Sequence, residues 1–195
     1  MIDYVRGEVA ELTPATVTID CNGVGYLAHI SLQTYSAIGD NKTAKIYIYE
    51  SVRQDAFVLF GFIDKHEREV FLYLISVSGV GPSTARVMLS SLSSKEVEAA
   101  IATEDVNILK SVKGIGTKTA QRIIVDLKDK IKFSGEGELP ASGKVVAPTL
   151  GHEAVSALVM LGFTQSNSQK VVAKIVKEAS ATSVEAIIKE ALKRL

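Results

Sequence analysis

The first 64 residues alternate between hydrophobic and polar positions with the two-residue period of half-buried β-strands. The alternation runs over residues 16–21 and returns over residues 24–30. Between these runs stands Asn22-Gly23, a pair that favours the left-handed backbone of a two-residue hairpin turn. The pattern therefore predicts two antiparallel strands joined directly at this turn.

Two further apolar runs, residues 44–49 and 56–60, flank the polar loop 50–55. A polar loop between two strands is most often a solvated hairpin tip. Together the runs predict five or six short strands in roughly 60 residues, which is typical of a small β-barrel. Among such barrels we favour the OB-fold for residues 1–64.

After Asp64 the hydrophobic spacing changes to the helical period. Residues 65–76 predict one helix. Ser93 and Glu96 form the pattern of a capping box, which predicts a second helix from there to about Ala102. The chain therefore changes from strands to helices at this point.

Residues 76–86 and 111–121 are two copies of one unit, offset by 35 positions. The identical positions are Ser76/Ser111, Val77/Val112, Gly79/Gly114, Gly81/Gly116, Thr84/Thr119 and Ala85/Ala120. Each copy places Gly-hydrophobic-Gly between two helices, and glycine permits both a tight turn and the close approach of another backbone. The free amides and the positive dipole end of the second helix suit a phosphate. This is the helix-hairpin-helix pattern, which binds DNA backbone independently of sequence.

The predicted DNA contacts lie in these two hairpins. In the first they are Gly79, Val80, Gly81, Ser83 and Thr84; in the second they are Gly114, Ile115, Gly116, Thr117, Lys118 and Arg122. The apolar residues Val80 and Ile115 are also expected to fill the core beneath each turn. An ordinary αα-hairpin with glycine turns would explain one copy as well, but two copies at a fixed offset favour DNA.

Two nucleotide-binding patterns are excluded by the residues present. A P-loop requires Gly-x-x-x-x-Gly-Lys-Ser/Thr, and although Lys118 is followed by a threonine, Thr117 and Val112 stand where its glycines must be. The dinucleotide pattern Gly-x-Gly-x-x-Gly lacks its third glycine in both copies. No nucleotide site is evident.

The last third of the chain predicts a tether and a small helical domain. Residues 134–149 contain three glycines and two prolines, which is typical of a flexible linker. Residues 150–195 predict a three-helix, UBA-like domain, with a capping box at Thr182 and Glu185 opening its last helix. Its helices are expected over 153–161, 166–179 and 182–195. Such a small tethered unit suits partner docking; a minor structural appendage is the alternative.

Composition adds limits to this picture. The chain has 195 residues, a length that allows one domain, two, or three small ones, and its 47% of hydrophobic residues is enough to form their cores. Cys21 is alone, so we expect no disulfide framework and no cysteine zinc site. No apolar run reaches the roughly 18 residues of a membrane span, and the start lacks a signal-peptide layout. A cytoplasmic protein is the simplest expectation.

The net charge of zero hides an uneven distribution. Residues 1–64 carry four basic and eight acidic side chains, whereas residues 65–133 carry eleven basic and eight acidic ones. Within 106–132 there are seven basic residues against Asp126 and Asp129. The positive charge is therefore concentrated around the second hairpin, where a phosphate-binding surface needs it.

Taken together, the chain resembles the RuvA family of bacterial Holliday-junction branch-migration proteins over its whole length. The motifs that carry the resemblance are residues 78–82 (SGVGP), 114–120 (GIGTKTA), 53–56 (RQDA) before 59–62 (LFGF), and 185–192. The resemblance implies an α+β protein with an OB-fold barrel (1–64), a tandem helix-hairpin-helix domain (65–133), a linker (134–149) and a three-helix docking domain (150–195). It implies no cofactor and no catalytic site.

The same resemblance implies a homotetramer that holds a four-way junction open and recruits the hexameric ATPase RuvB, with the resolvase RuvC as a further partner. It places an acidic pin at the junction centre, here Arg53, Gln54 and Asp55, with one carboxylate where the family's pin carries two. It implies docking of RuvB through apolar residues of the last domain. For that contact we select Leu158, Leu161, Phe163 and Ile188.

Two other functions remain as alternatives. A helix-hairpin-helix glycosylase or nuclease would need a placed acid or lysine in a pocket, and Asp126 and Asp129 alternate with lysines on what the pattern predicts to be a solvated helix. The three histidines have no metal-ligand spacing. A single-strand binder acting through the barrel would need more aromatic residues than its strands supply.

Overall fold

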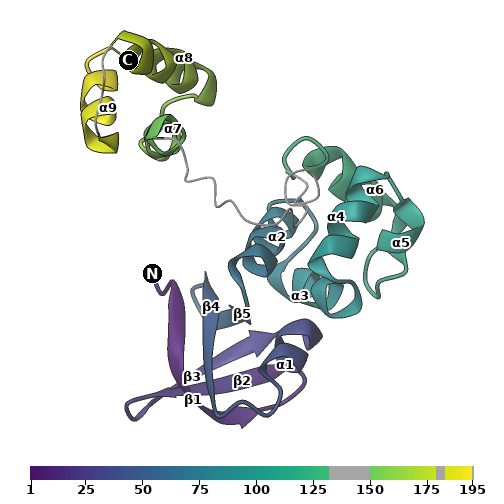
Figure 1. The fold of residues 1–195 in the computed structure, drawn as a ribbon. Helices are drawn as coiled ribbons and strands as arrows, with labels where there is room; N and C mark the ends of the chain where they lie inside the picture. The colour runs from purple at the N-terminus through teal and green to yellow at the C-terminus, as the bar shows by residue number, and fades with distance from the viewer. Residues whose placement is uncertain (132–149, 179–182, 195) are drawn as a thin grey trace, which may run out of the picture. The chain divides into compact units, whose positions relative to one another are not determined.

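A computed structural model describes residues 1–131, 150–178 and 183–194 of the chain (Figure 1). Its contacts divide the chain into two compact units, Met1–Glu138 and Leu139–Leu195, and each unit is described by itself. The linker expected at 134–149 lies outside the described residues.

Five strands of the first unit form a closed barrel in the order β1-β2-β3-β5-β4. They are β1 (Tyr4–Leu12), β2 (Thr16–Cys21), β3 (Val24–Ile30), β4 (Thr43–Val52) and β5 (Phe57–Phe62). Strands β3 and β5 pair in parallel, and the other neighbours pair antiparallel. The predicted OB-type barrel is confirmed.

The hairpin predicted between β2 and β3 is also confirmed. Asn22 has φ 54° and Gly23 has φ 88°, the two positive values that a type I′ turn requires. On the strands beside it, Val17, Ile19 and Ala28 are fully buried. The alternation in the sequence therefore corresponds to one face of the sheet lining the barrel core.

Helix α1 (Leu32–Ile38), which the alternating pattern does not predict, interrupts the strands. Ser31 begins it, because its hydroxyl accepts a hydrogen bond from the Thr34 amide at 3.1 Å. Seven residues are too few for a helical period to stand out in the sequence. The N-cap residue Ser31 was the one local feature of the sequence that could have indicated this helix.

The turn between β4 and β5 is shorter than predicted. Strand β4 continues to Val52 and β5 begins at Phe57, and these two residues pair. The Arg53 amide then donates to the carbonyl of Ala56 at 2.8 Å, which closes a tight connection. The polar side chains of this turn are therefore held at the end of a continuous two-stranded ribbon.

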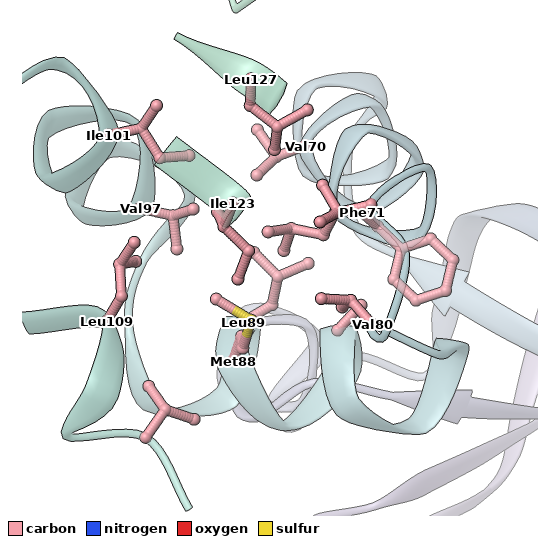
Figure 2. Packing of buried hydrophobic residues seen from close by; sticks show 14 of the residues in the cluster. Val70, Phe71, Val80, Met88, Leu89, Val97, Ile101, Leu109, Ile123 and Leu127 are labelled. Carbon is pink, nitrogen blue, oxygen red and sulfur yellow. The ribbon is translucent and has the colours of Figure 1, made fainter. Parts of the chain in front are cut away.

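Five helices follow the barrel and share one apolar core (Figure 2). They are α2 (Lys65–Ile75), α3 (Pro82–Ser91), α4 (Ser94–Ala102), α5 (Val106–Lys110) and α6 (Thr117–Leu127). The predicted capping box at the start of α4 is confirmed, with both the Ser93 and the Glu96 side chains bonded to backbone amides. Val80 and Met88 lie together in this core with Ile123, which is 35 or more positions further along the chain.

Barrel and helices of the first unit are joined by aromatic packing and by one buried carboxylate. The ring of Phe71 on α2 lies 4.8 Å from that of Phe62 on β5, centroid to centroid. Glu67, only 2% exposed, accepts hydrogen bonds from the hydroxyls of Ser31 and Thr34 in the barrel. Burial raises the pKa of Glu67, opposed by these hydrogen bonds. The barrel and α2 are thus connected by specific contacts.

Replacing Glu67 by alanine is expected to lower the free energy of unfolding by about 2–4 kcal/mol, because it leaves a cavity and two buried hydroxyls without their acceptor. Glu67→Gln keeps the volume and an acceptor, so it should cost much less. Because the folded pKa is raised, the wild type should lose stability as pH rises from 4.5 through that folded pKa. Urea unfolding across this range should show no such loss in Glu67→Gln; a profile parallel to wild type would contradict the assignment.

The second unit is a three-helix bundle of α7 (Leu150–Met160), α8 (Gln165–Glu178) and α9 (Val184–Ala191). Its core contains Ala154, Leu158, Val172, Ile175, Ile187 and Ala191. The N-cap of α9 is Ser183, whose hydroxyl accepts from the Ala186 amide at 3.2 Å, rather than Thr182, which lies outside the described residues. No helix in the described parts of either unit has the length and apolar character to cross a membrane.

Candidate nucleic-acid interface

The repeat in the sequence is a repeat in the backbone. Gly79 has φ 95° and Gly114 has φ 94°, values in the left-handed region that favours glycine. Gly81 and Gly116 have φ and ψ of −89° and 169°, and of −83° and 166°, and each is the N-cap of the helix that follows. Two segments 35 residues apart thus fold into the same turn.

The apolar residue inside each turn points into the core. Val80 is 4% exposed and Ile115 is 5% exposed. The Val80 amide donates to the carbonyl of Val77 at 3.0 Å, and the Ile115 amide to that of Val112 at 3.1 Å. The side chains of the predicted contacts Val80 and Ile115 therefore serve the fold, and the backbone beside them forms the surface.

The amides at the start of α3 and α6 have no partners in the described chain. Neither N-cap has a side chain to accept from them, and the first amides with a carbonyl partner are those of Ala85 and Ala120. The amides of Gly81, Ser83 and Thr84, and those of Gly116 through Thr119, have no acceptor within the described residues. Both helix N-termini therefore offer donors and a positive dipole end to an external anion.

The protein itself does not require glycine at two of these positions. A Cβ added at Gly81 or Gly116 would meet no atom within 4 Å, and their φ values suit any residue. Gly79 and Gly114, by contrast, need their positive φ. The absence of a side chain at 81 and 116 leaves open space beside the free amides of both helix starts.

The two hairpins converge on one surface. A single open hollow is lined by Ser78, Gly79, Lys118, Thr119, Gln121 and Arg122. It joins the turn of the first hairpin to the helix of the second, so Ser78 and Gly79 line the same hollow as Lys118 and Arg122. Lys118 and Arg122 are exposed, and no described acid pairs with them.

Not every cation of this region is free. Lys128 at the end of α6 forms an ion pair with Glu104, which raises the pKa of Lys128 and lowers that of Glu104. Counting charges along the sequence therefore overstates the positive field, whereas the cations at the hairpins themselves remain unpaired.

The predicted pin residues Arg53, Gln54 and Asp55 are all exposed in the turn between β4 and β5. None of the three side chains makes a hydrogen bond or ion pair with another described residue, so they are free to meet a ligand. Glu50 lies on β4 instead, only 17% exposed and 3.9 Å from the N-terminal amine. It adds no second carboxylate to the turn.

The predicted docking residues of the second unit separate into surface and core. Leu158 is fully buried, so its side chain is not available on the surface. Phe163 and Ile188 pack partly against the same core, and Leu161 is 60% exposed. Met160, which periodicity did not single out, is 89% exposed beside it. An apolar surface therefore exists at the end of α7, but it is formed by Met160 and Leu161 rather than by the whole predicted set.

The structure also describes the residues named for the enzyme alternative. Within the described ranges, no three His, Cys, Asp or Glu side chains group closely enough to hold a metal ion. Asp129, a candidate acid of the enzyme alternative, is exposed, and Asp126 is half-buried beside the exposed Val125.

Comparison with known proteins agrees with this geometry. The family model described as RuvA N terminal domain matches residues 1–61, that described as SAM-like helix-hairpin-helix tandem matches 71–129, and that described as RuvA, C-terminal domain matches 150–195. The chain is similar to the Holliday junction branch migration complex subunit RuvA of Bacteroides thetaiotaomicron, 59% identical, of Bacteroides fragilis, 56% identical, and of Christiangramia forsetii, 51% identical. Each match covers the whole of both chains.

Proposed function

Because the chain belongs to the RuvA family, we propose that it binds four-way junction DNA as the DNA-binding subunit of a branch-migration complex in recombination and repair. The observation that carries the proposal is the pair of hairpins with the same backbone turn, which have free amides at both helix starts and share a hollow lined by Lys118 and Arg122. Such a surface binds phosphates without reading bases. Sequence independence is what a protein acting at a moving junction requires.

Each hairpin grips one DNA backbone. Its amides donate to phosphate oxygens, and the helix dipole adds to the attraction. Lys118 and Arg122 neutralise phosphate charges on the backbone that the second hairpin binds. A homotetramer would present four such pairs of hairpins, one to each arm, and hold the junction open as a square.

The turn at 53–56 acts as the pin at the junction centre. The free carboxylate of Asp55 repels phosphates there and keeps the crossing strands apart. Arg53 contacts DNA beside it. Each subunit contributes a single pin carboxylate, since Gln54 is neutral and Glu50 lies on the strand.

The second unit connects the DNA-binding part to its motor. We assign the apolar surface at Met160 and Leu161 to docking of RuvB, the hexameric ATPase, with Phe163 and Ile188 supporting it from the edge of the core. RuvC is a further partner at the junction. The chain itself acts without chemistry, in the cytoplasm where the bacterial chromosome lies.

Replacing Lys118 by alanine should weaken junction binding and lower the slope of log K against log salt by about 0.9 for each subunit engaged, because one phosphate contact is lost. The fold should not change, since Lys118 is exposed. Lys189→Ala on α9 removes the same charge from the second unit and should leave the slope as in wild type. A wild-type slope in Lys118→Ala would remove this lysine from the phosphate contacts.

A titration of purified protein against four-way junction, duplex and single strand of matched sequence tests the proposal as a whole. We expect the junction to bind most tightly, in a complex whose mass corresponds to tetramers. Equal affinity for all three DNAs, or specific strand cleavage in Mg²⁺, would overturn it.

A further inference from the structure

The two hairpins carry their cations at different positions. At the offset of 35, Ser83 stands where the second copy has Lys118, and Val87 where it has Arg122. The first copy instead has Arg86, opposite the neutral Gln121. The amides of the two hairpins are equivalent, but the charge beside the first one must come from a different place.

Arg86 lines a hollow of about 220 Å³ between α3 and the barrel. The lining residues are His29, Ser51, Arg53, Ala56, Val58, Phe60, Pro82, Ser83 and Arg86. The hollow therefore runs from the start of the first hairpin's helix to the base of the pin turn. Its lining includes two arginines and no acidic residue, and it is smaller than the roughly 300–1,000 Å³ that drug-sized ligands occupy.

Arg86 is fixed in this hollow rather than neutralised. Its Nη1 donates to the carbonyls of Ala15 at 3.2 Å and Ile30 at 3.4 Å, which hold the group without cancelling its charge. Its remaining N–H groups have no described partner. Burial, helped by the nearby charge of Arg86, lowers the pKa of His29, which favours its neutral form. The positive charge of the hollow is therefore that of Arg86 and Arg53.

We propose that this hollow holds one phosphate group of the DNA strand nearest the crossover, with Arg86 and Arg53 as its cations and the hydroxyls of Ser83 and Ser51 as further donors. A fixed planar guanidinium is well suited to a phosphate. The site would lie between the first hairpin and the pin, so that the protein contacts one DNA strand continuously from the arm to the junction centre. This inference rests on the proposed function and deepens it.

The test compares Arg86→Gln, Arg53→Gln and the double variant on junction and on duplex DNA across a range of salt. Each single change should weaken junction binding roughly tenfold, the cost of one charged contact. The affinity for duplex DNA should fall less than about threefold, because a duplex has no strand at the pin. The fold-loss of affinity in the double variant should be smaller than the product of the two single fold-losses, because both arginines contact one phosphate.

Arg86 also links α3 to the barrel, so a variant that spares its bonds is needed. Ser51→Asp introduces a carboxylate into the hollow from β4 and leaves Arg86 in place; it should show the same loss selective for the junction. Ser166→Asp, an equivalent change near the start of α8 in the second unit, should bind as wild type. Thermal unfolding of every variant reports damage to the fold.

Equal losses on junction and duplex, or wild-type binding by Ser51→Asp alongside a lower melting temperature in Arg86→Gln, would reduce Arg86 to a structural link and overturn the inference. The proposed function can fail separately. If the wild type does not prefer the junction over duplex and Lys118→Ala binds as the wild type does, the proposed DNA-binding function is wrong, and the phosphate site in the hollow fails with it.

Discussion

Replacing Gly116 by serine should weaken junction binding at least tenfold while leaving the fold as stable as before or slightly more so. Gly116 is the N-cap of α6, its φ and ψ suit serine, and a Cβ there meets nothing within 4 Å. Serine is a preferred N-cap residue, better than glycine by a few tenths of a kcal/mol. Its hydroxyl would accept from the Lys118 or Thr119 amide. The substitution therefore satisfies the amides that we propose for phosphate and fills the space that the DNA backbone needs.

The opposite signs of the two effects make this variant informative, because most losses of binding accompany losses of stability. Gly114→Ser serves as its comparison. It forces a side chain into the left-handed region at φ 94° and should cost about 1–2 kcal/mol of folding free energy. Calorimetry and junction titration of both variants give the result. If Gly116→Ser binds the junction as tightly as wild type, the amides at this helix start do not hold the DNA.

Replacing Met160 and Leu161 together by glutamate should slow motor-driven branch migration at least tenfold, with junction affinity unchanged. Both side chains are largely exposed, at 89% and 60%, so the bundle keeps its core. An apolar contact that must take up two carboxylates loses most of its affinity, because each charge is desolvated without a partner. Migration is measured with the partner ATPase on a synthetic junction.

A control variant adds the same charge elsewhere on the bundle. Gln169→Glu with Ala173→Glu places two carboxylates on exposed positions of α8 and should migrate junctions normally. Leu158→Ala is a different kind of change, because Leu158 is fully buried and its loss should unfold the bundle. Normal migration by the Met160 and Leu161 double variant would place the docking surface elsewhere.

The strongest local signals in the sequence predicted the fold correctly. Asn22-Gly23 gave the turn, because few other pairs adopt two positive φ values in succession. The capping box at Ser93 and Glu96 gave the start of α4. The glycine repeat gave both hairpins, because its conformational requirement is local. Helix α1 was missed because one short segment between strands has no clear period.

Features made by tertiary contact could not be predicted from local pattern. Leu158 and Met160 are both apolar residues of α7, and only the packing of the bundle shows that one is core and the other surface. Arg86 was overlooked because comparison of the repeats directs attention to Lys118 and Arg122. Its hollow is assembled from three strands and a helix that are distant in the sequence.

Amide hydrogen exchange of the hairpins, measured with and without four-way junction DNA, tests the central proposal most directly. The amides of Gly81, Ser83 and Thr84 and those of residues 116–119 have no internal acceptor, so they should exchange rapidly in the free protein. We predict that junction DNA slows exchange in both segments together, while the described loop at Asn22 is unchanged. Exchange that stays fast in both segments under saturating junction would contradict the account.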